Sequence, residues 1–352
     1  MASDSAVASL LGVASRDSVR AHWAPRAVPR VHVSTLTEAS FLRDFVAASR
    51  PVVLLGATAH WRARALLAND DWRERLLELA GAGAETDVHT TPTGRGDAAV
   101  TKPTGGGRVF VMPQTRRMPL RAALDELAAC RCGVPYLSAQ DDNVRKQMPG
   151  LLDALGGDGA CAVATAALGG AASVEAINVW IGASPAIVST THKDHYNNTI
   201  SVLRGVKRVC LLPPADVLWV YERRLPVAGY EHDDARCLRG SGAAGCESAC
   251  WRIARDEAAS ALPWICVDPE RPDLSTFPLF AHASPVTVDV AAGETLFLPG
   301  LWHHQVSHPT AAGDVTIAIN TWQSFDFNGI VYATYALLRE AALLTTRSDS
   351  SE

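Results

Sequence analysis

Residues 191–198 read THKDHYNN and lie between two apolar stretches, AINVWIGASPAIV at 176–188 and TISVL at 199–203. Both flanking stretches have the Val, Ile, Trp and Thr content that is typical of β-strands. Two histidines, a lysine and an aspartate therefore stand at the edge of a strand-rich core. A buried charge is costly unless it is paired or binds a metal. The chain must fold so that this strand end reaches either solvent or a binding site.

The chain has 352 residues, enough for one large domain or two small ones. A net charge of −5 gives no indication of a nucleic acid or an anionic membrane as partner. No apolar run approaches the roughly 18 residues of a membrane span. Eight cysteines and no signal peptide favour reduced thiols and a cytoplasmic location, with the nucleus as the alternative. A zinc site is disfavoured because the C-x2-C spacing is missing from the candidate set of Cys237, Cys246, Cys250 and Cys266.

Hydrophobic periodicity predicts a mixture of strands and helices before residue 174, mostly short strands from 174 to 323 and a helix near the end of the chain. Residues 1–30 are expected to be a variable leader, because Asp4 and Asp17 count against a mitochondrial presequence. The expected elements are strands near 30–36 and 51–56, helices at 38–49, 70–80 and 118–129, a long Gly-, Thr- and Pro-rich loop at 91–108, a helix within 150–173 and a helix at 327–344. Residues 174–323 predict an antiparallel sandwich or barrel, interrupted by a surface insertion at 236–250.

Two of the charged residues in THKDHYNN form an HxD pattern. In an extended strand, His192 and Asp194 point to one face, whereas Lys193 and His195 point to the other. One imidazole and one carboxylate are two of the three ligands in a 2-His-1-carboxylate site, which leaves coordination positions open on Fe(II). An isolated HxD is more often a polar strand end in solvent, so the hypothesis needs further ligands elsewhere.

The segment GETLFLPGLWHHQVSH, at 293–308, offers three further histidines, His303, His304 and His308. His303 and His304 would lie on opposite faces of a strand, so only one can share a pocket with the HxD pair, and periodicity leaves the choice open. Lys207 follows a strand–turn–strand pattern, SVLRGVKRVCLL, that folds it back toward the HxD strand. Its compact ammonium suits a carboxylate ligand, although a solvent-facing strand lysine is the alternative.

Taken together, these segments resemble the JmjC, or cupin-like, family of Fe(II)- and 2-oxoglutarate-dependent oxygenases. The matching features are HKDHYNN, the lysine 15 residues after His192, GETLFLPGLWHHQV and INTW. The resemblance is strongest to the small JmjC-only lysyl hydroxylases and spans about residues 35–340, apart from 91–108 and 236–250. It implies a mainly β protein, a double-stranded β-helix (jelly roll) with flanking N-terminal and C-terminal helices. The implied catalytic domain is single and covers 31–345, with its jelly-roll core at about 174–323 and C-terminal helices at 327–344.

The resemblance also assigns site residues. The family motif P-x-x-W-x-H matches Pro299, Trp302 and His304, which implies that His304 completes the iron site with His192 and Asp194. The implied 2-oxoglutarate-binding residues are Lys207, Ser189 and Tyr136 at the distal carboxylate, with Asn198, Asn320 and Trp322 lining the pocket. The chain departs from its most similar relatives at three positions, with Ile200 in place of Tyr, Gln305 in place of a second His and Ser189 in place of Thr.

The implied reaction consumes O2 and 2-oxoglutarate, releases succinate and CO2 and oxidises a protein side chain. The implied substrate is a lysine of a translation-associated, developmentally regulated GTP-binding protein, hydroxylated at carbon 3 to the (3S) product. Glu222, Asp233 and Asp326 are candidates for a carboxylate in a lysine pocket. The alternatives are an Nε-methyl-lysine demethylase and a non-catalytic cupin that binds a metal or a partner. The apolar VYATYALL of the C-terminal helix fits either a homodimer interface or packing on its own domain.

Overall fold

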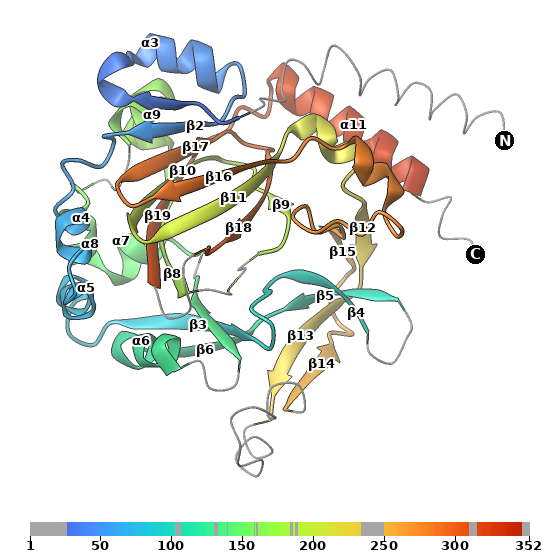
Figure 1. Cartoon of the computed structure of the whole chain (residues 1–352), viewed down its shortest axis with the longest axis horizontal. Coiled ribbons are helices and arrows are strands. Elements are labelled where there is room, and N and C mark those ends of the chain that lie inside the picture. The colour runs from blue at the N-terminus through green and yellow to red at the C-terminus, as the bar shows by residue number, and fades with distance from the viewer. Residues whose placement is uncertain are drawn as a thin grey trace.

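The computed structural model describes residues 27–102, 107–129, 133–138, 140–157, 159, 161–183, 186, 189–233, 250–309 and 315–346. Two β-sheets form its centre (Figure 1). The large sheet has the order β1 (Arg30–His32), β2 (Val52–Leu55), β17 (Glu294–Leu298), β10 (Asn197–Arg204), β19 (Val315–Gln323), β8 (Val174–Ala183), β7 (Val134–Leu137), β3 (Glu85–Thr91) and β6 (Gln114–Pro119). The small sheet has the order β16 (Val286–Ala291), β11 (Val206–Leu212), β18 (His303–Ser307) and β9 (His192–Lys193).

The two sheets pack face to face through one apolar cluster. Val202 of β10 and Leu296 of β17 share this cluster with Val209 of β11 and Val290 of β16, and all four are fully buried. This arrangement confirms the predicted jelly-roll core. The large sheet also takes up strands that precede residue 174, so the jelly roll is extended at both edges by the first half of the chain.

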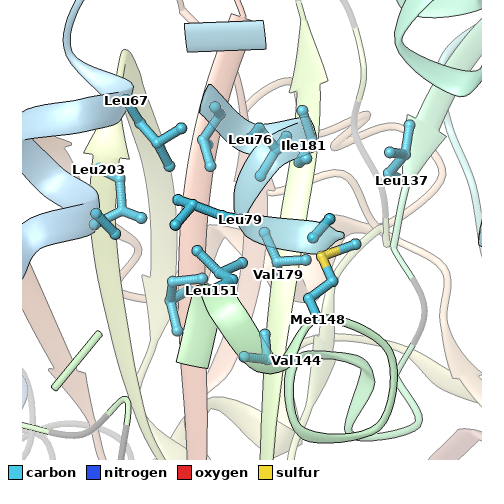
Figure 2. Close-up of a cluster of buried hydrophobic side chains, with 14 of the residues drawn as sticks. Leu67, Leu76, Leu79, Leu137, Val144, Met148, Leu151, Val179, Ile181 and Leu203 are labelled. Atoms are coloured by element: carbon cyan, nitrogen blue, oxygen red, sulfur yellow. The ribbon is translucent and has the colours of Figure 1, made fainter. Parts of the chain in front are cut away.

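The other face of the large sheet is covered by helices from the first half of the chain, as the resemblance implied. These helices are α4 (Arg62–Leu67), α5 (Trp72–Ala80), α6 (Leu120–Ala129), α7 (Asn143–Gln147) and α8 (Pro149–Ala154). Their leucines pack against alternate residues of β8, such as Val179 and Ile181 (Figure 2). Because side chains alternate along a strand, the intervening residues of β8 and β19 point toward the small sheet.

The remaining helices and helical turns lie at the edge of the large sheet and near the C-terminal helix. At the β2 edge lie α3 (Glu38–Phe41), which continues as a π-helical turn at Leu42–Val46, and α9 (Ala162–Ala167). Short 3-10 turns occupy Val33–Thr35, Ala171–Ser173, Pro214–Leu218 and Pro278–His282. The long helix α11 (Ile330–Thr346) packs on the turn at Pro214–Leu218. Within the part of the chain described here, no helix is both long and apolar enough to cross a membrane.

A second layer of strands lies beside the jelly roll. It comprises a four-stranded sheet, β14 (Trp251–Arg255), β13 (Val227–His232), β5 (Arg108–Met112) and β4 (Ala98–Thr101), and the pair β12 (Glu222–Leu225) and β15 (Leu262–Ile265). The prediction of one long loop at 91–108 is therefore wrong for residues 98–101, because these residues form a strand that pairs with β5. Most of the predicted 236–250 insertion lies outside the described residues, as do Cys237, Cys246 and residues 1–26 of the predicted leader.

The strand register brings distant residues together. A turn at Gly205, where φ is +74°, connects β10 of the large sheet to β11 of the small sheet, which also contains the HxD strand β9, and so brings Lys207 into that sheet. A Cβ at Gly205 would lie 2.6 Å from Thr316 Oγ1, so the turn requires glycine for space as well as for its backbone angle. On β18, His304 pairs with Leu211 of β11 on one side and with His192 of β9 on the other.

Candidate active site

Three side chains predicted to bind a metal converge between the sheets. One ligand atom from each of His192, Asp194 and His304 lies within 4.8 Å of the other two. His192 Nε2 is 3.9 Å from Asp194 Oδ1, and His304 Nε2 is 3.7 Å from Asp194 Oδ2. These separations are too long for hydrogen bonds and suit three donor atoms that face one ion.

The protonation of both imidazoles fits metal binding. His192 Nδ1 lies 2.9 Å from the Thr190 carbonyl oxygen, and His304 Nδ1 lies 3.0 Å from the Trp302 carbonyl oxygen. A carbonyl only accepts hydrogen bonds, so each Nδ1 carries a proton, which leaves Nε2 as the ring nitrogen that can bind a metal. Backbone carbonyls commonly orient metal-binding histidines in this way. Two imidazoles and a carboxylate are the donor set of an Fe(II) oxygenase site.

The structure also explains why His304 and not its neighbour faces this centre. His303 lies opposite Lys193 in the β9–β18 register and points to the other side of the small sheet. There the Tyr335 hydroxyl of α11 lies 3.3 Å from His303 Nε2. Burial holds the pKa of His303 well below its usual value, so this imidazole is neutral.

The predicted anchor for 2-oxoglutarate is a buried cation. Lys207 is 4% exposed, and its Nζ donates a hydrogen bond to the Tyr136 hydroxyl at 3.0 Å. The ammonium also lies over the Tyr136 and Trp180 rings, at 5.7 and 5.6 Å from their centroids. Burial lowers the pKa of Lys207 to about 7. No described carboxylate pairs with Lys207, so the pocket holds a cation that lacks an anion.

A chain of side-chain amides supports the metal-binding aspartate. Asn178 Nδ2 donates to Asn320 Oδ1 at 3.2 Å, and Asn320 Nδ2 donates to Asn198 Oδ1 at 3.3 Å. Asn198 Nδ2 in turn lies 3.5 Å from Asp194 Oδ2. Trp180 Nε1 donates to Asn320 Oδ1 at 2.7 Å and fixes the orientation of that amide. Asn178 and Trp180 were not predicted from the sequence, although their spacing on β8 places them on one face.

All nine predicted site residues line a single pocket with about 480 Å³ of empty space, including its open mouth. The set consists of Tyr136, Ser189, His192, Asp194, Asn198, Lys207, His304, Asn320 and Trp322. Ile200, which departs from the family pattern, lines the same pocket and adds to its apolar wall. The sequence-based prediction therefore named residues that the fold brings together, while their individual roles stay predictions.

The acids predicted for a lysine pocket are not among the described residues that line the cavity. The buried Glu222 carboxylate forms a two-point ion pair with the Arg339 guanidinium, at 2.7 and 2.6 Å. Asp233 and Asp326 are exposed.

Two neighbours of His192 were missed as site residues. Trp264 stacks parallel to the His192 ring, with 6.2 Å between centroids and 4° between planes. Its Nε1 donates to Thr190 Oγ1 at 2.9 Å. Thr190 also accepts the hydrogen bond from His192, so it joins the metal ligand to the surrounding loop. An aromatic residue on a strand is usually part of the core, which is why sequence alone did not single out Trp264.

Comparison with known proteins agrees with this geometry. The sequence model of the cupin-like domain family matches residues 38–328 of this chain. The human "Bifunctional peptidase and (3S)-lysyl hydroxylase JMJD7" is 32% identical over 89% of this chain and 89% of its own length. The Arabidopsis thaliana "Lysine-specific demethylase JMJ32" is 33% identical over 85% of this chain and 82% of its own. The "JmjC domain-containing protein E" of Dictyostelium discoideum is 28% identical, covering 89% and 88%.

Proposed function

This chain belongs to the cupin-like JmjC family, whose oxygenases use Fe(II) and 2-oxoglutarate, and we propose that it hydroxylates a lysyl side chain of a protein. The observation that carries the proposal is one pocket that joins a His–Asp–His triad to the buried, unpaired ammonium of Lys207. A non-catalytic metal-binding cupin has no need of the second feature. When bound, iron and 2-oxoglutarate supply the oxidising chemistry, which consumes O2 and releases succinate and CO2.

The residues of the chain divide the remaining work. His192, Asp194 and His304 would hold the ion, and all three line the pocket into which a substrate would have to reach. Lys207 supplies the positive charge for the distal carboxylate of 2-oxoglutarate, and the Tyr136 hydroxyl fixes the position of that ammonium. The amide chain that ends at Asn198 holds the Asp194 carboxylate in one orientation.

The finer substrate assignment rests on similarity. The human relative named a (3S)-lysyl hydroxylase matches nearly the whole chain, which supports lysine hydroxylated at carbon 3 as the product. We propose a translation-associated, developmentally regulated GTP-binding protein as the target. A homodimer through α11 and a cytoplasmic location are also proposed. Exposed Ile330 and Leu337 on that helix, with 79% and 71% of their surface accessible, support the homodimer.

A second candidate function is demethylation of Nε-methyl-lysine, which the Arabidopsis relative's name favours. The two reactions share the pocket and differ in the carbon that is oxidised. Oxidation of an N-methyl group releases formaldehyde, whereas oxidation of carbon 3 leaves the oxygen on the peptide.

The test offers iron-loaded protein two versions of one lysine peptide from such a GTPase, unmodified and Nε-methylated, with 2-oxoglutarate and O2. Mass spectrometry of the peptide and a formaldehyde assay are read together, and His304→Ala is the inactive control. Gain of one oxygen atom on the unmodified peptide, dependent on His304, supports the hydroxylase. Formaldehyde from the methylated peptide with no oxygen gain would replace it with the demethylase. Iron binding without oxidation of either peptide or formation of succinate would favour the non-catalytic cupin.

A further inference from the structure

One tyrosine of the C-terminal helix α11 contacts both segments that carry the metal ligands, from the side of the small sheet that faces away from the pocket. Tyr335 is 2% exposed and belongs to the buried side of α11. Its hydroxyl lies 3.3 Å from His303 Nε2, and the centroid of its ring lies 5.6 Å from the Lys193 ammonium nitrogen. Both contacted residues are direct chain neighbours of metal ligands.

The strand that carries Lys193 has little support of its own. β9 is two residues long, lies at the edge of the small sheet and pairs only with β18. A strand this short has few backbone hydrogen bonds, so it opens locally at a low cost. The Glu222 carboxylate interacts electrostatically with Lys193 but is already paired with Arg339. An aromatic face attracts a cation, so the Tyr335 ring helps to hold Lys193, and with it β9, in place.

A strained leucine connects the same helix to the metal-binding aspartate. Leu301 is fully buried and shares an apolar cluster with Tyr335. Its φ is 71°, in the left-handed region that bulky residues seldom adopt. Its backbone N–H donates to the Asp194 carbonyl oxygen at 3.0 Å. A backbone of this kind persists only where its surroundings hold it. The cluster beneath α11 provides that support, so α11 stabilises the position of Asp194 as well.

The three metal ligands are thus supported from the side away from the pocket, each through a neighbour in the chain. These neighbours are His303, Lys193 and Leu301. Tyr335 is not among the residues that line the pocket, so it would touch neither the metal nor 2-oxoglutarate. Residues that orient metal ligands from outside the coordination sphere commonly set the affinity for the metal. We propose that Tyr335 is a positioning residue, through which α11 holds the metal ligands in place. The inference requires the metal site and is independent of which side chain the protein oxidises.

The test measures the Mn(II) affinity of the full-length chain by titration calorimetry, at a temperature at which circular dichroism shows every variant folded. Tyr335→Phe removes the hydroxyl contact with His303 and keeps the ring, whereas Tyr335→Leu removes both. Tyr332→Phe is the matched control, because it removes a hydroxyl from the same helix and the Tyr332 ring packs on Phe327 instead. We expect the control to bind Mn(II) as the wild type does. Binding should weaken by about 3- to 10-fold in Tyr335→Phe and by about 10- to 100-fold in Tyr335→Leu.

Two further readouts separate positioning from a general loss of stability. His303→Phe removes the nitrogen that the Tyr335 hydroxyl contacts, so its effect on Mn(II) affinity should not add to that of Tyr335→Phe. At saturating Mn(II), the electron paramagnetic resonance spectrum of Tyr335→Phe should be broader than that of the wild type, because less firmly held ligands adopt a wider range of geometries. A variant that is only less stable would give the wild-type spectrum once it is folded and saturated.

Wild-type Mn(II) affinity in both Tyr335 variants would overturn the inference and leave Tyr335 as an ordinary core residue. Equal weakening in Tyr332→Phe would also overturn it, because any change on α11 would then suffice, and so would additive effects of Tyr335→Phe and His303→Phe. Mn(II) binding that depends on Tyr335, in a protein that oxidises no lysyl peptide, would support the inference and reject the proposed function. Oxidation of a lysyl peptide with unchanged Mn(II) affinity in the Tyr335 variants would do the reverse.

Discussion

Gly182→Ala isolates the contribution of the Tyr136–Lys207 contact to 2-oxoglutarate binding. Gly182 lies on β8 beneath the Tyr136 ring, and a Cβ added there would be 2.2 Å from both Tyr136 Cδ2 and Cε2. Its φ lies outside the left-handed region, so alanine fits the backbone. The Tyr136 ring is the main obstacle, and His308 Cε1 would lie 3.3 Å from the added Cβ. Ordinary van der Waals contact begins at 3.4 Å, so the ring must retreat by more than 1 Å.

That displacement breaks the 3.0 Å hydrogen bond between the Tyr136 hydroxyl and the Lys207 ammonium. A hydrogen bond to a charged group contributes about 1.5–3 kcal/mol, so affinity for 2-oxoglutarate should fall by about 10- to 100-fold. Overpacking of this kind also lowers the free energy of unfolding by about 1–3 kcal/mol. The first effect should disappear when Tyr136→Phe is already present, because the hydroxyl contact is then lost in advance.

The assay is calorimetric titration of Mn(II)-loaded protein with 2-oxoglutarate, at a temperature at which circular dichroism shows each variant folded. Gly229→Ala is the control, because it is also a strand glycine and a Cβ there meets nothing within 4 Å. It should bind 2-oxoglutarate as the wild type does. Unchanged affinity in Gly182→Ala, in a folded protein, would refute the role given to Tyr136 and its contact with Lys207.

Three further outcomes are expected. The pKa of Lys207 is about 7 and an anionic partner raises it, so binding of 2-oxoglutarate above pH 7 takes up a proton. The affinity for 2-oxoglutarate, measured by calorimetry, should therefore be constant below pH 7 and fall about tenfold per pH unit above it. An affinity that stays constant to pH 9 would contradict this. Arg339→Met leaves the buried Glu222 carboxylate unpaired and should lower the free energy of urea unfolding by about 1–3 kcal/mol, whereas adding Glu222→Gln should restore part of it. Mn(II) at a hundredfold excess over its Kd should stabilise the wild type by about 2.7 kcal/mol in thermal melts and leave His304→Ala unchanged, and equal shifts in both would place the metal elsewhere.

The metal ligands show where sequence reasoning reaches its limit. Strand alternation placed His192 and Asp194 on one face, because that periodicity is local. It left His303 and His304 as alternatives, and only the family motif favoured His304. The physical reason lies in the register of β18 against β9, which pairs His304 with His192 and His303 with Lys193. Register depends on how the whole small sheet is assembled and cannot be read from either segment alone.

Other features were hidden for the same reason. The segment 91–108 has the composition of a loop, yet residues 98–101 gain strand structure by pairing with β5. Glu222 was a reasonable acid to suspect, but its partner Arg339 is supplied by α11, more than a hundred residues later. The helices at 70–80 and 327–344 were predicted well, because amphipathic spacing is a local property.

We propose that one pocket holds iron and 2-oxoglutarate together and oxidises the 2-oxoglutarate to succinate. The most direct test measures O2-dependent succinate formation by anaerobically Fe(II)-loaded wild type, Lys207→Met and His304→Ala, with the lysyl peptide present. We expect succinate from the wild type, a strongly raised KM for 2-oxoglutarate in Lys207→Met and no succinate from His304→Ala. Succinate formation that persists in His304→Ala, or iron-loaded wild type that forms none, would contradict it.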